Sequence, residues 1–199
     1  MIEMINISSE KPYSIFKKNY DKAKKKKQYA IEAAAISSYD NLKKEVDSRF
    51  VNIKYIENDC WTFFSNYNSP KSQAFQSFNQ VSILFYWNTI NLQTRIKAKI
   101  FKSSKDLSDE HFSSRSKYKN ALAISSMQSK KIKSYSLVKK HYSEILDSEK
   151  ILEERPSYWG GFSFIPFYFE FWEGQKYRLN KREVFELNKG NWINYFLQP

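Results

Sequence analysis

The residues Val81-Ser-Ile-Leu-Phe-Tyr-Trp87, followed by Thr94-Arg-Ile-Lys-Ala-Lys-Ile-Phe-Lys102, carry the clearest structural signal in the chain. The first run is almost entirely apolar, which is typical of a strand covered on both faces. The second run alternates apolar and cationic side chains, which is the pattern of a half-buried strand. Two such runs joined by a short polar segment predict a hairpin, and therefore a sheet whose strands pair with their neighbours in sequence.

Similar signals continue on both sides of this pair. We expect further strands at 29–37, 50–56, 61–66, 161–172, 182–187 and 192–197, with Asn188-Lys189-Gly190 turning the last two into a hairpin. Helices are expected over 12–28, from Ser69-Pro70 to Phe78, from either Ser104 or Ser108, and after Ser134 or Ser136. Strands in hairpins with inserted helices predict a mainly β, α+β fold: a β-barrel surrounded by helices.

The length and composition predict one domain over residues 1–199. The chain is 41% hydrophobic and 18% aromatic, so it can bury a core. It has no long apolar run and no secretory leader, and we expect a cytoplasmic protein without a membrane partner. One cysteine and two histidines exclude an intramolecular disulfide and a cysteine-rich metal centre, so no metal is expected.

The charge balance alone does not identify a partner. The chain has 33 lysines and arginines against 21 acidic residues, a net charge of +12. A basic surface for a polyanion is one interpretation. The other is compositional, because 27 of the cations are lysine in a chain rich in Asn, Ile, Tyr, Phe and Ser, and we favour it. A nucleic-acid partner is therefore not expected.

The arginines carry more information, because a planar fork of donors suits phosphate and carboxylate groups better than a lysine does. A series of short strings, which together contain four of the six arginines, resembles the pyridoxamine 5′-phosphate oxidase family over 49–199. The strings are Arg49-Phe-Val-Asn-Ile-Lys54, Phe63-Phe-Ser-Asn66, Ser69-Pro-Lys71, Val81 to Trp87, Gln93, Phe112-Ser-Ser-Arg115, Ser126-Met-Gln-Ser129, Pro156-Ser-Tyr-Trp-Gly-Gly-Phe162, Glu170-Phe-Trp172 and Arg178-Leu-Asn-Lys-Arg182.

The resemblance implies a split β-barrel that binds FMN at the interface of a homodimer, with a helical segment at 1–28, the barrel at 29–199 and a C-terminal dimerisation hairpin. It implies an oxidase that converts pyridoxamine or pyridoxine 5′-phosphate to pyridoxal 5′-phosphate and reduces O2 to H2O2. The implied cofactor contacts are Arg49, Lys54, Phe64, Ser65, Lys71, Gln93, Gln128, Ser129, Trp172 and Arg182. The implied substrate contacts are Lys54, His111, Arg115, Lys119 and Arg178, with Arg178 and Asn180 beside the reacting carbon.

Several positions depart from the family pattern, mostly where the family binds its substrate. His111 stands in place of a tyrosine, Lys119 in place of a serine and Asn180 in place of a histidine, while Pro70 replaces a cofactor-contacting arginine. Lys181 follows where an aspartate is common, and the segment that covers the substrate has no counterpart in 1–11. An FMN oxidoreductase with another substrate, a non-catalytic flavin-binding protein and a basic nucleic-acid-binding domain are therefore the alternatives.

Overall fold

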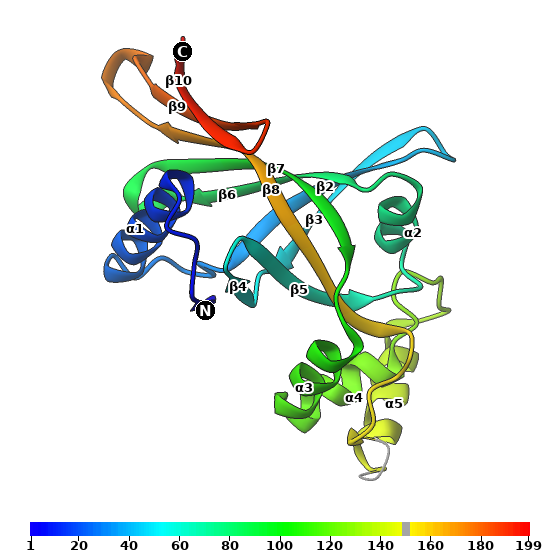
Figure 1. The fold of residues 1–199 in the computed structure, drawn as a ribbon. Helices are drawn as coiled ribbons and strands as arrows, with labels where there is room; N and C mark the ends of the chain where they lie inside the picture. The colour runs from blue at the N-terminus through cyan, green and yellow to red at the C-terminus, as the bar shows by residue number, and fades with distance from the viewer. Residues whose placement is uncertain (149–151) are drawn as a thin grey trace.

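A computed structural model of the chain describes residues 1–148 and 152–199, which contain one ten-stranded sheet and five α-helices (Figure 1). The strands are β1 (Glu3–Ile5), β2 (Ala33–Asp40), β3 (Glu45–Asn52), β4 (Tyr55–Glu57), β5 (Cys60–Asn66), β6 (Gln80–Trp87), β7 (Leu92–Lys102), β8 (Trp159–Glu173), β9 (Lys181–Asn188) and β10 (Asn191–Leu197). The helices are α1 (Lys11–Lys25), α2 (Pro70–Ser77), α3 (Lys105–Ser114), α4 (Lys117–Ser125) and α5 (Tyr135–Leu146), with short 3-10 turns η1 (Asn88–Ile90) and η3 (Lys176–Arg178).

The sheet is antiparallel except at one edge. Its order is β1-β4-β5-β8-β7-β6-β2-β3, with β9 also paired to β8 and β10 to β9, and only β1 and β4 run parallel. The long strand β8 pairs with β5, β7 and β9 and so joins the two ends of the molecule. Figure 1 shows α3, α4 and α5 at one of these ends and the β9–β10 hairpin at the other.

The sheet curls towards a barrel but does not close. β3 pairs with β2 and β4 pairs with β5, although only two residues separate β3 from β4. At this break, Ile53 donates its amide to the Glu32 carbonyl (3.0 Å), and Lys54 donates its amide to the Thr62 carbonyl of β5 (2.8 Å). The chain therefore changes partner between consecutive residues, and the barrel is split at Lys54.

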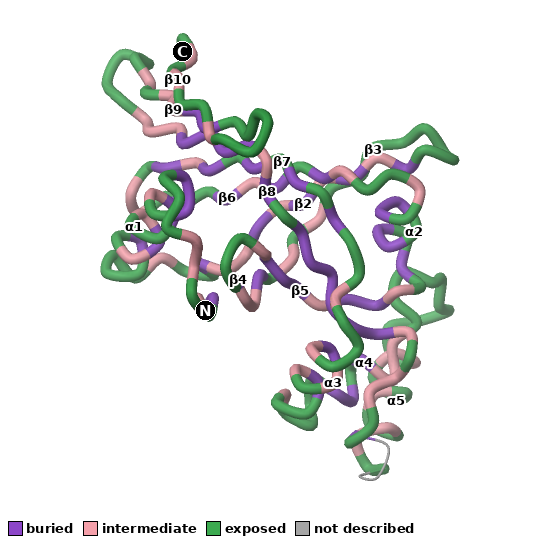
Figure 2. The backbone as a smooth tube through the Cα atoms, viewed as in Figure 1, coloured by how far each residue is buried: buried purple, intermediate pink, exposed green. Residues whose placement is uncertain are grey.

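Aromatic side chains of α1 fill the inside of the curled sheet. The ring of Phe16 lies 4.5 Å from that of Trp61 and 5.4 Å from those of Phe85 and Trp87, centroid to centroid. All four side chains are buried, and Figure 2 shows burial along β5, β8 and one side of α1. Burial of such large apolar surfaces is the main favourable contribution to folding, so α1 holds the two halves of the sheet together.

The predicted strands are found, with three differences. The strand expected over 29–37 begins at Ala33, because Lys27 and Ala30 have left-handed backbones (φ 55° and 46°). The strand expected over 50–56 is divided by the change of partner between β3 and β4. β6 was expected to be covered on both faces, but Ser82 and Tyr86 are exposed in the chain, so the strand alternates instead.

The helices also follow the sequence closely, and the open choices of helix start are resolved. α3 begins after Ser104, whose hydroxyl accepts from the Leu107 amide at 3.2 Å, whereas Ser108 lies buried inside the helix. α5 begins after Ser134. β1 and α4 were not predicted, because three residues are too few for a period and α4 carries little amphipathic pattern. No helix in the described residues combines the length and apolar character needed to cross a membrane.

Candidate active site

A cleft of about 490 Å³ lies where β3 and β4 part. Its walls come from the end of β3, from β5, from the first residue of β8, and from the region around α3 and α4. Eight of the residues expected to bind cofactor or substrate line this cleft: Lys54, Phe64, Ser65, Lys71, His111, Arg115, Lys119 and Gln128. The fold thus brings together side chains spread over more than seventy positions of sequence, as the resemblance implies.

Lys71 is a buried cation with no acidic partner in the described residues. Its Nζ donates to Ser65 Oγ (2.9 Å), Ser69 Oγ (3.2 Å) and Gln128 Oε1 (2.9 Å), all neutral. Burial, aided by the nearby charge of Arg49, lowers the pKa of Lys71 to about 8, so the amine is still charged at pH 7. It lies in the first turn of α2, where the helix dipole adds positive potential. This corner is therefore built to receive an anion.

Arg115 forms a second cationic centre across the cleft. Its guanidinium lies 4.2 Å over the ring of Trp159, and one of its terminal nitrogens donates to the Lys119 carbonyl at 2.8 Å. The other terminal nitrogen, Nη1, is buried and has no partner among the described residues. Burial lowers the pKa of Arg115 to about 10, and an unpaired buried donor is costly. Arg115 itself lines the cleft, so its charge is available to an oxyanion there.

Lys54 and His111 belong to the same centre. Burial lowers the pKa of Lys54, and the charges of Lys119 and Arg115 lower it further against the opposing effect of Glu32. The same causes, burial first and then Arg115, Lys54 and Lys119, lower the pKa of His111 to about 4, so its imidazole is neutral at pH 7. Its ring stacks on Phe64 with centroids 3.7 Å apart, and Phe64 in turn lies parallel to Trp159 at 5.5 Å.

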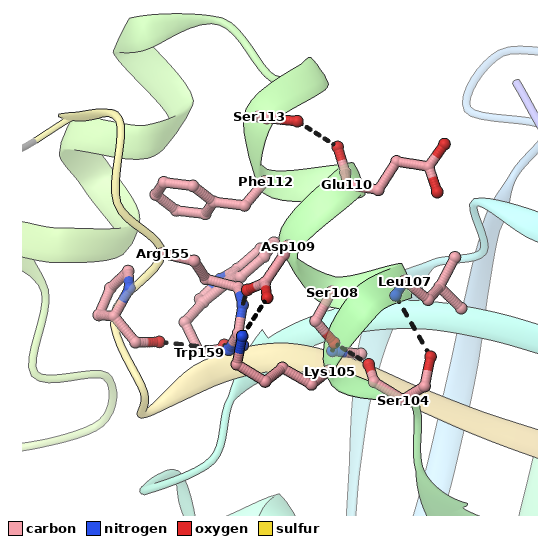
Figure 3. Close-up of polar contacts among 12 residues, drawn as sticks. Ser104, Lys105, Leu107, Ser108, Asp109, Glu110, Phe112, Ser113, Arg155 and Trp159 are labelled. Atoms are coloured by element: carbon pink, nitrogen blue, oxygen red, sulfur yellow. Dashed lines mark hydrogen bonds and ion pairs between the residues drawn. The ribbon is translucent and has the colours of Figure 1, made fainter.

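Polar contacts between α3 and the start of β8 position this wall (Figure 3). Arg155 donates from Nε to Asp109 of α3 (2.6 Å) and from Nη1 to the Trp159 carbonyl. Ser108 accepts from the Gly161 amide at 3.1 Å. A Cβ at Gly161 would lie 2.4 Å from Ser103 Oγ, so only glycine lets the strand pass this close to its neighbour. Because Arg155 joins Asp109 of α3 to the start of β8, its role is structural.

Two expected cofactor contacts lie outside the lining of the cleft. Arg49 donates to Ser38 Oγ (2.8 Å) and forms an ion pair with Asp47, so its guanidinium lies in the neighbouring hollow beside α2. Its charge nevertheless acts on Lys71. Ser129 is exposed and has a left-handed backbone (φ 68°) next to Gln128. Their contact with a cofactor stays a prediction.

A second group of expected contacts lies on three neighbouring strands. Gln93 of β7, Trp172 of β8 and Arg182 of β9 are direct register partners. The Nε of Arg182 donates to Glu170 Oε1 at 2.9 Å, and Arg95 donates to the other oxygen of this buried carboxylate at 2.8 Å. Glu170 therefore fixes the position of Arg182.

Arg178 and Asn180 belong to the loop that follows Trp172. Tyr177 and Arg178 both have left-handed backbones (φ 56° and 62°), and Tyr177 is 93% exposed. Consecutive non-glycine residues in this conformation are strained, which is common where a loop presents a functional group. Asn180 Oδ1 accepts from the Gln175 amide at 3.0 Å and so closes the loop.

The second group lies far from the cleft within one chain. Trp159, in the cleft, and Trp172 are at opposite ends of β8, and thirteen strand residues span roughly 40 Å. Figure 1 shows the same separation between α3 at one end of β8 and β9 at the other. One copy of the chain therefore does not unite all the expected site residues.

Comparison with known proteins shows the family of the chain. A curated protein from Colwellia psychrerythraea (strain 34H), named pyridoxine/pyridoxamine 5′-phosphate oxidase, is 33% identical over 195 residues, which is 96% of this chain and 88% of that protein. This chain belongs to the pyridoxine/pyridoxamine 5′-phosphate oxidase family. The resemblance drawn from the sequence strings is thereby confirmed, and the protein is a member of a family of oxidoreductases.

Further similarities concern the fold and the C-terminal region. The family model for the pyridoxine 5′-phosphate oxidase C-terminal dimerisation region matches residues 159–199. The structure of PhzG from Burkholderia lata 383 superposes with a TM-score of 0.89 at 22% identity, covering 95% of this chain and 93% of the other. A pyridoxamine 5′-phosphate oxidase-related, FMN-binding protein from Nostoc punctiforme gives a TM-score of 0.77 at 12% identity, covering 96% and 99%. The expected α+β split-barrel fold is confirmed.

Two residues of this region were not among the site residues expected from sequence. Trp159 lines the cleft and provides the surface on which Arg115 rests, but the sequence analysis contains it only within the string 156–162. Tyr55 contacts the lining residue His111, with its hydroxyl 2.7 Å from His111 Nδ1. This contact has no local signal in the sequence, because the two residues are 56 positions apart.

The unpaired charge of Lys71 predicts a measurable effect on stability. The folded pKa of about 8 is below the ordinary 10.5, so the charged amine destabilises the ligand-free protein below pH 8, and this cost disappears as the pH rises towards 10.5. Lys71→Met should remove up to about 3 kcal/mol of that pH-dependent change in the free energy of unfolding. It should also reduce the stabilisation of the wild type by inorganic phosphate to the part that comes from the second cationic centre.

Denaturant titrations between pH 7 and pH 10.5, with and without phosphate, check both effects. Lys18→Met is the matched control, because Lys18 is exposed on α1. Identical pH dependence in wild type and Lys71→Met would contradict the assignment of Lys71 as an anion-binding cation.

Proposed function

We propose that the protein is an FMN-dependent oxidase that converts pyridoxamine or pyridoxine 5′-phosphate to pyridoxal 5′-phosphate, with reduction of O2 to H2O2. The observation that carries the proposal is that the cleft is lined by two groups of cations with different contacts. The Lys71 amine is held by Ser65, Ser69 and Gln128, whereas Lys54, Arg115 and Lys119 lie with His111, and Arg115 rests on the ring of Trp159. Two phosphates, one from the cofactor and one from the substrate, match these two centres.

The residues present fit FMN. The buried amine of Lys71, with Ser65 and Gln128 beside it, offers a site for the FMN phosphate, and the aromatic wall of Phe64 offers an apolar surface. When bound, FMN supplies the hydride acceptor that no protein side chain provides and passes two electrons to O2. The protein itself binds and orients the cofactor and the substrate, and it excludes water from the cleft.

The second cationic centre fits the phosphate of the substrate. Lys54, Arg115 and Lys119 all line the cleft, and the Arg115 guanidinium keeps one donor, Nη1, without a partner among the described residues. A phosphate ester held there would be placed against the aromatic wall, and orientation of the reacting carbon is the main contribution a protein makes to hydride transfer. Arg178 would then orient the other end of the substrate, and Asn180 would support the loop that carries it.

We propose further that the active unit is a homodimer. Arg178, Asn180, Gln93, Trp172 and Arg182 lie at the far end of β8 from the cleft, so they reach a cofactor only if a second copy brings them there. The match of 159–199 to a dimerisation region supports this arrangement. Each of two equivalent sites would then combine the cleft of one copy with the β7–β9 group of its partner.

A second candidate is an oxidoreductase of the same fold with another substrate. His111, Lys119 and Asn180 differ from the family pattern at substrate positions. PhzG, whose fold is similar, was solved in complex with tetrahydrophenazine-1-carboxylic acid. The cationic centre of this chain would accept a carboxylate as well as a phosphate.

Turnover of the FMN-loaded protein separates these candidates. Pyridoxamine 5′-phosphate and pyridoxine 5′-phosphate should each yield pyridoxal 5′-phosphate and H2O2, and pyridoxine without phosphate should react at least 100-fold more slowly by kcat/KM, because a phosphate held by several charged donors contributes about 3 kcal/mol. Tight FMN binding without aldehyde formation from either phosphate would reject the vitamin B6 substrate and leave the second candidate.

Arg182→Lys should weaken FMN binding although the positive charge is kept. Lysine loses the planar fork that Glu170 orients, and we expect a loss of about 1–3 kcal/mol in FMN binding. Arg95→Lys is the matched control, since Arg95 pairs with the same carboxylate but has no expected cofactor contact. Fluorescence titration with FMN measures both. Equal losses in the two variants would show that only the structural role around Glu170 matters.

Mixing two defective variants tests the shared site. Lys71→Met damages the cleft, and Arg182→Ala damages the β7–β9 group. In a heterodimer of the two, one site carries both changes and the other carries neither, so random subunit exchange should restore FMN binding to about one quarter of the sites. Each homodimer alone should bind FMN poorly. No recovery in a mixture shown by mass spectrometry to contain heterodimers would contradict a site built from two copies.

A further inference from the structure

Tyr55 and His111 form a hydrogen-bonded pair beside the second cationic centre. Tyr55 begins β4, directly after the residue at which the chain changes partner, and His111 lies in the last turns of α3. The Tyr55 hydroxyl lies 2.7 Å from His111 Nδ1. His111 also lines the cleft, so Nε2 is the ring nitrogen left to meet a ligand.

The imidazole is held in one orientation by its neighbours. The ring of Phe64 stacks on it at 3.7 Å with an interplanar angle of 10°, and Trp159 is nearly parallel at 6.3 Å. The ring of Tyr55 meets it edge-on at 5.4 Å and 90°. Rotation of the ring would break both the stacking and the hydrogen bond, so the pair is a fixed part of the wall.

The charges around the pair are arranged asymmetrically. Lys54 before β4, Arg115 after α3 and Lys119 of α4 face the imidazole, while β5 and β8 contribute the uncharged rings of Phe64 and Trp159. The acidic groups nearby, Glu110 of α3 and Glu3 of β1, act on Tyr55 instead. The three cations and burial keep His111 neutral, and burial keeps the Tyr55 phenol protonated.

These protonation states favour one tautomer. A phenol is a good donor and the unprotonated nitrogen of imidazole a good acceptor, so Tyr55 donates to Nδ1 and the ring proton sits on Nε2. The cleft then receives a neutral N–H donor on a wall that also carries Arg115. An oxyanion bound by the three cations would cancel much of the potential that keeps the imidazole from taking up a proton.

We propose that Tyr55 is a positioning residue that fixes His111 with Nε2–H towards the cleft as a donor to the phosphate oxygens of the substrate, and that binding of this dianion draws a proton onto His111. The inference rests on the proposed function for the location of the phosphate. The proton comes from solvent and is added at Nδ1. The Tyr55 hydroxyl, which can donate or accept, then accepts from the new N–H.

The chain contains only two histidines, so NMR can follow this proton directly. In long-range ¹H–¹⁵N spectra of the FMN-loaded protein, His141→Gln assigns the two rings. We expect His111 to show the Nε2–H tautomer and to stay neutral from pH 8 to about pH 5. Saturating inorganic phosphate should raise its titration midpoint by about one pH unit or more, whereas pyridoxal without phosphate should not.

Tyr55→Phe tests the role of the hydroxyl. Without it, the tautomer preference should be lost, and the affinity for inorganic phosphate should fall on the order of tenfold, as expected for one buried hydrogen bond in a charged network. Tyr118→Phe is the control, because Tyr118 is exposed on α4. Its NMR spectrum and phosphate affinity should equal those of the wild type.

The outcomes separate the inference from the proposed function. If inorganic phosphate raises the titration midpoint of His111 as expected but pyridoxal 5′-phosphate does not bind, the proposed vitamin B6 substrate is wrong and the inference stands. If pyridoxal 5′-phosphate binds and His111 does not respond, the inference is wrong and the proposed function stands. An Nδ1–H tautomer in the wild type, or a Tyr55→Phe variant with unchanged tautomer and phosphate affinity, would also overturn it.

Discussion

The structure depends on two consecutive amides that donate in opposite directions. Ile53 bonds to the Glu32 carbonyl and Lys54 to the Thr62 carbonyl, so a single extended segment is shared between two edges of the sheet. Had both amides joined the same edge, the sheet would have had either a longer β3 or a longer β4 and no gap between them. The gap holds the cleft, and Lys54 lines it because this residue stands at the break between β3 and β4.

The cleft contains four basic groups whose pKa values are lowered, so that the neutral form of each is favoured. Lys71 is buried and Lys54, Arg115 and His111 are half-buried, and no carboxylate is paired with the Lys71 amine or the Arg115 guanidinium in the part of the chain that the structure describes. A protein that needed only stability would have neutralised such charges. Their retention means that the missing negative charge comes from outside the chain, and two such centres call for two anions.

Much of this could be predicted from sequence, for identifiable reasons. The alternation in Thr94–Lys102 and the Ser-Pro start of α2 are local signals, and the structure follows them. The strings around Arg115 and Gln128 located the cleft because their order matches a family.

The rest is set by tertiary contacts. The hydrogen bond of Arg49 to Ser38 of β2 and the pairing of Tyr55 with His111 join residues from different elements. The division of the expected contacts between two ends of β8 is likewise invisible to a one-dimensional pattern.

The helical segment between β7 and β8 has a consequence for how this family changes its chemistry. Because β7 and β8 are antiparallel neighbours, everything between Lys102 and Trp159 is topologically a hairpin loop. His111, Arg115 and Lys119 are all carried by that loop, whereas Ser65 and Lys71 belong to β5 and α2. Substitutions at these three positions can therefore accumulate without altering the sheet or the Lys71–Ser65 pair, and among the described residues only Gln128 ties this loop to that pair. Residues that bind the cofactor can then be inherited while residues that bind the substrate change.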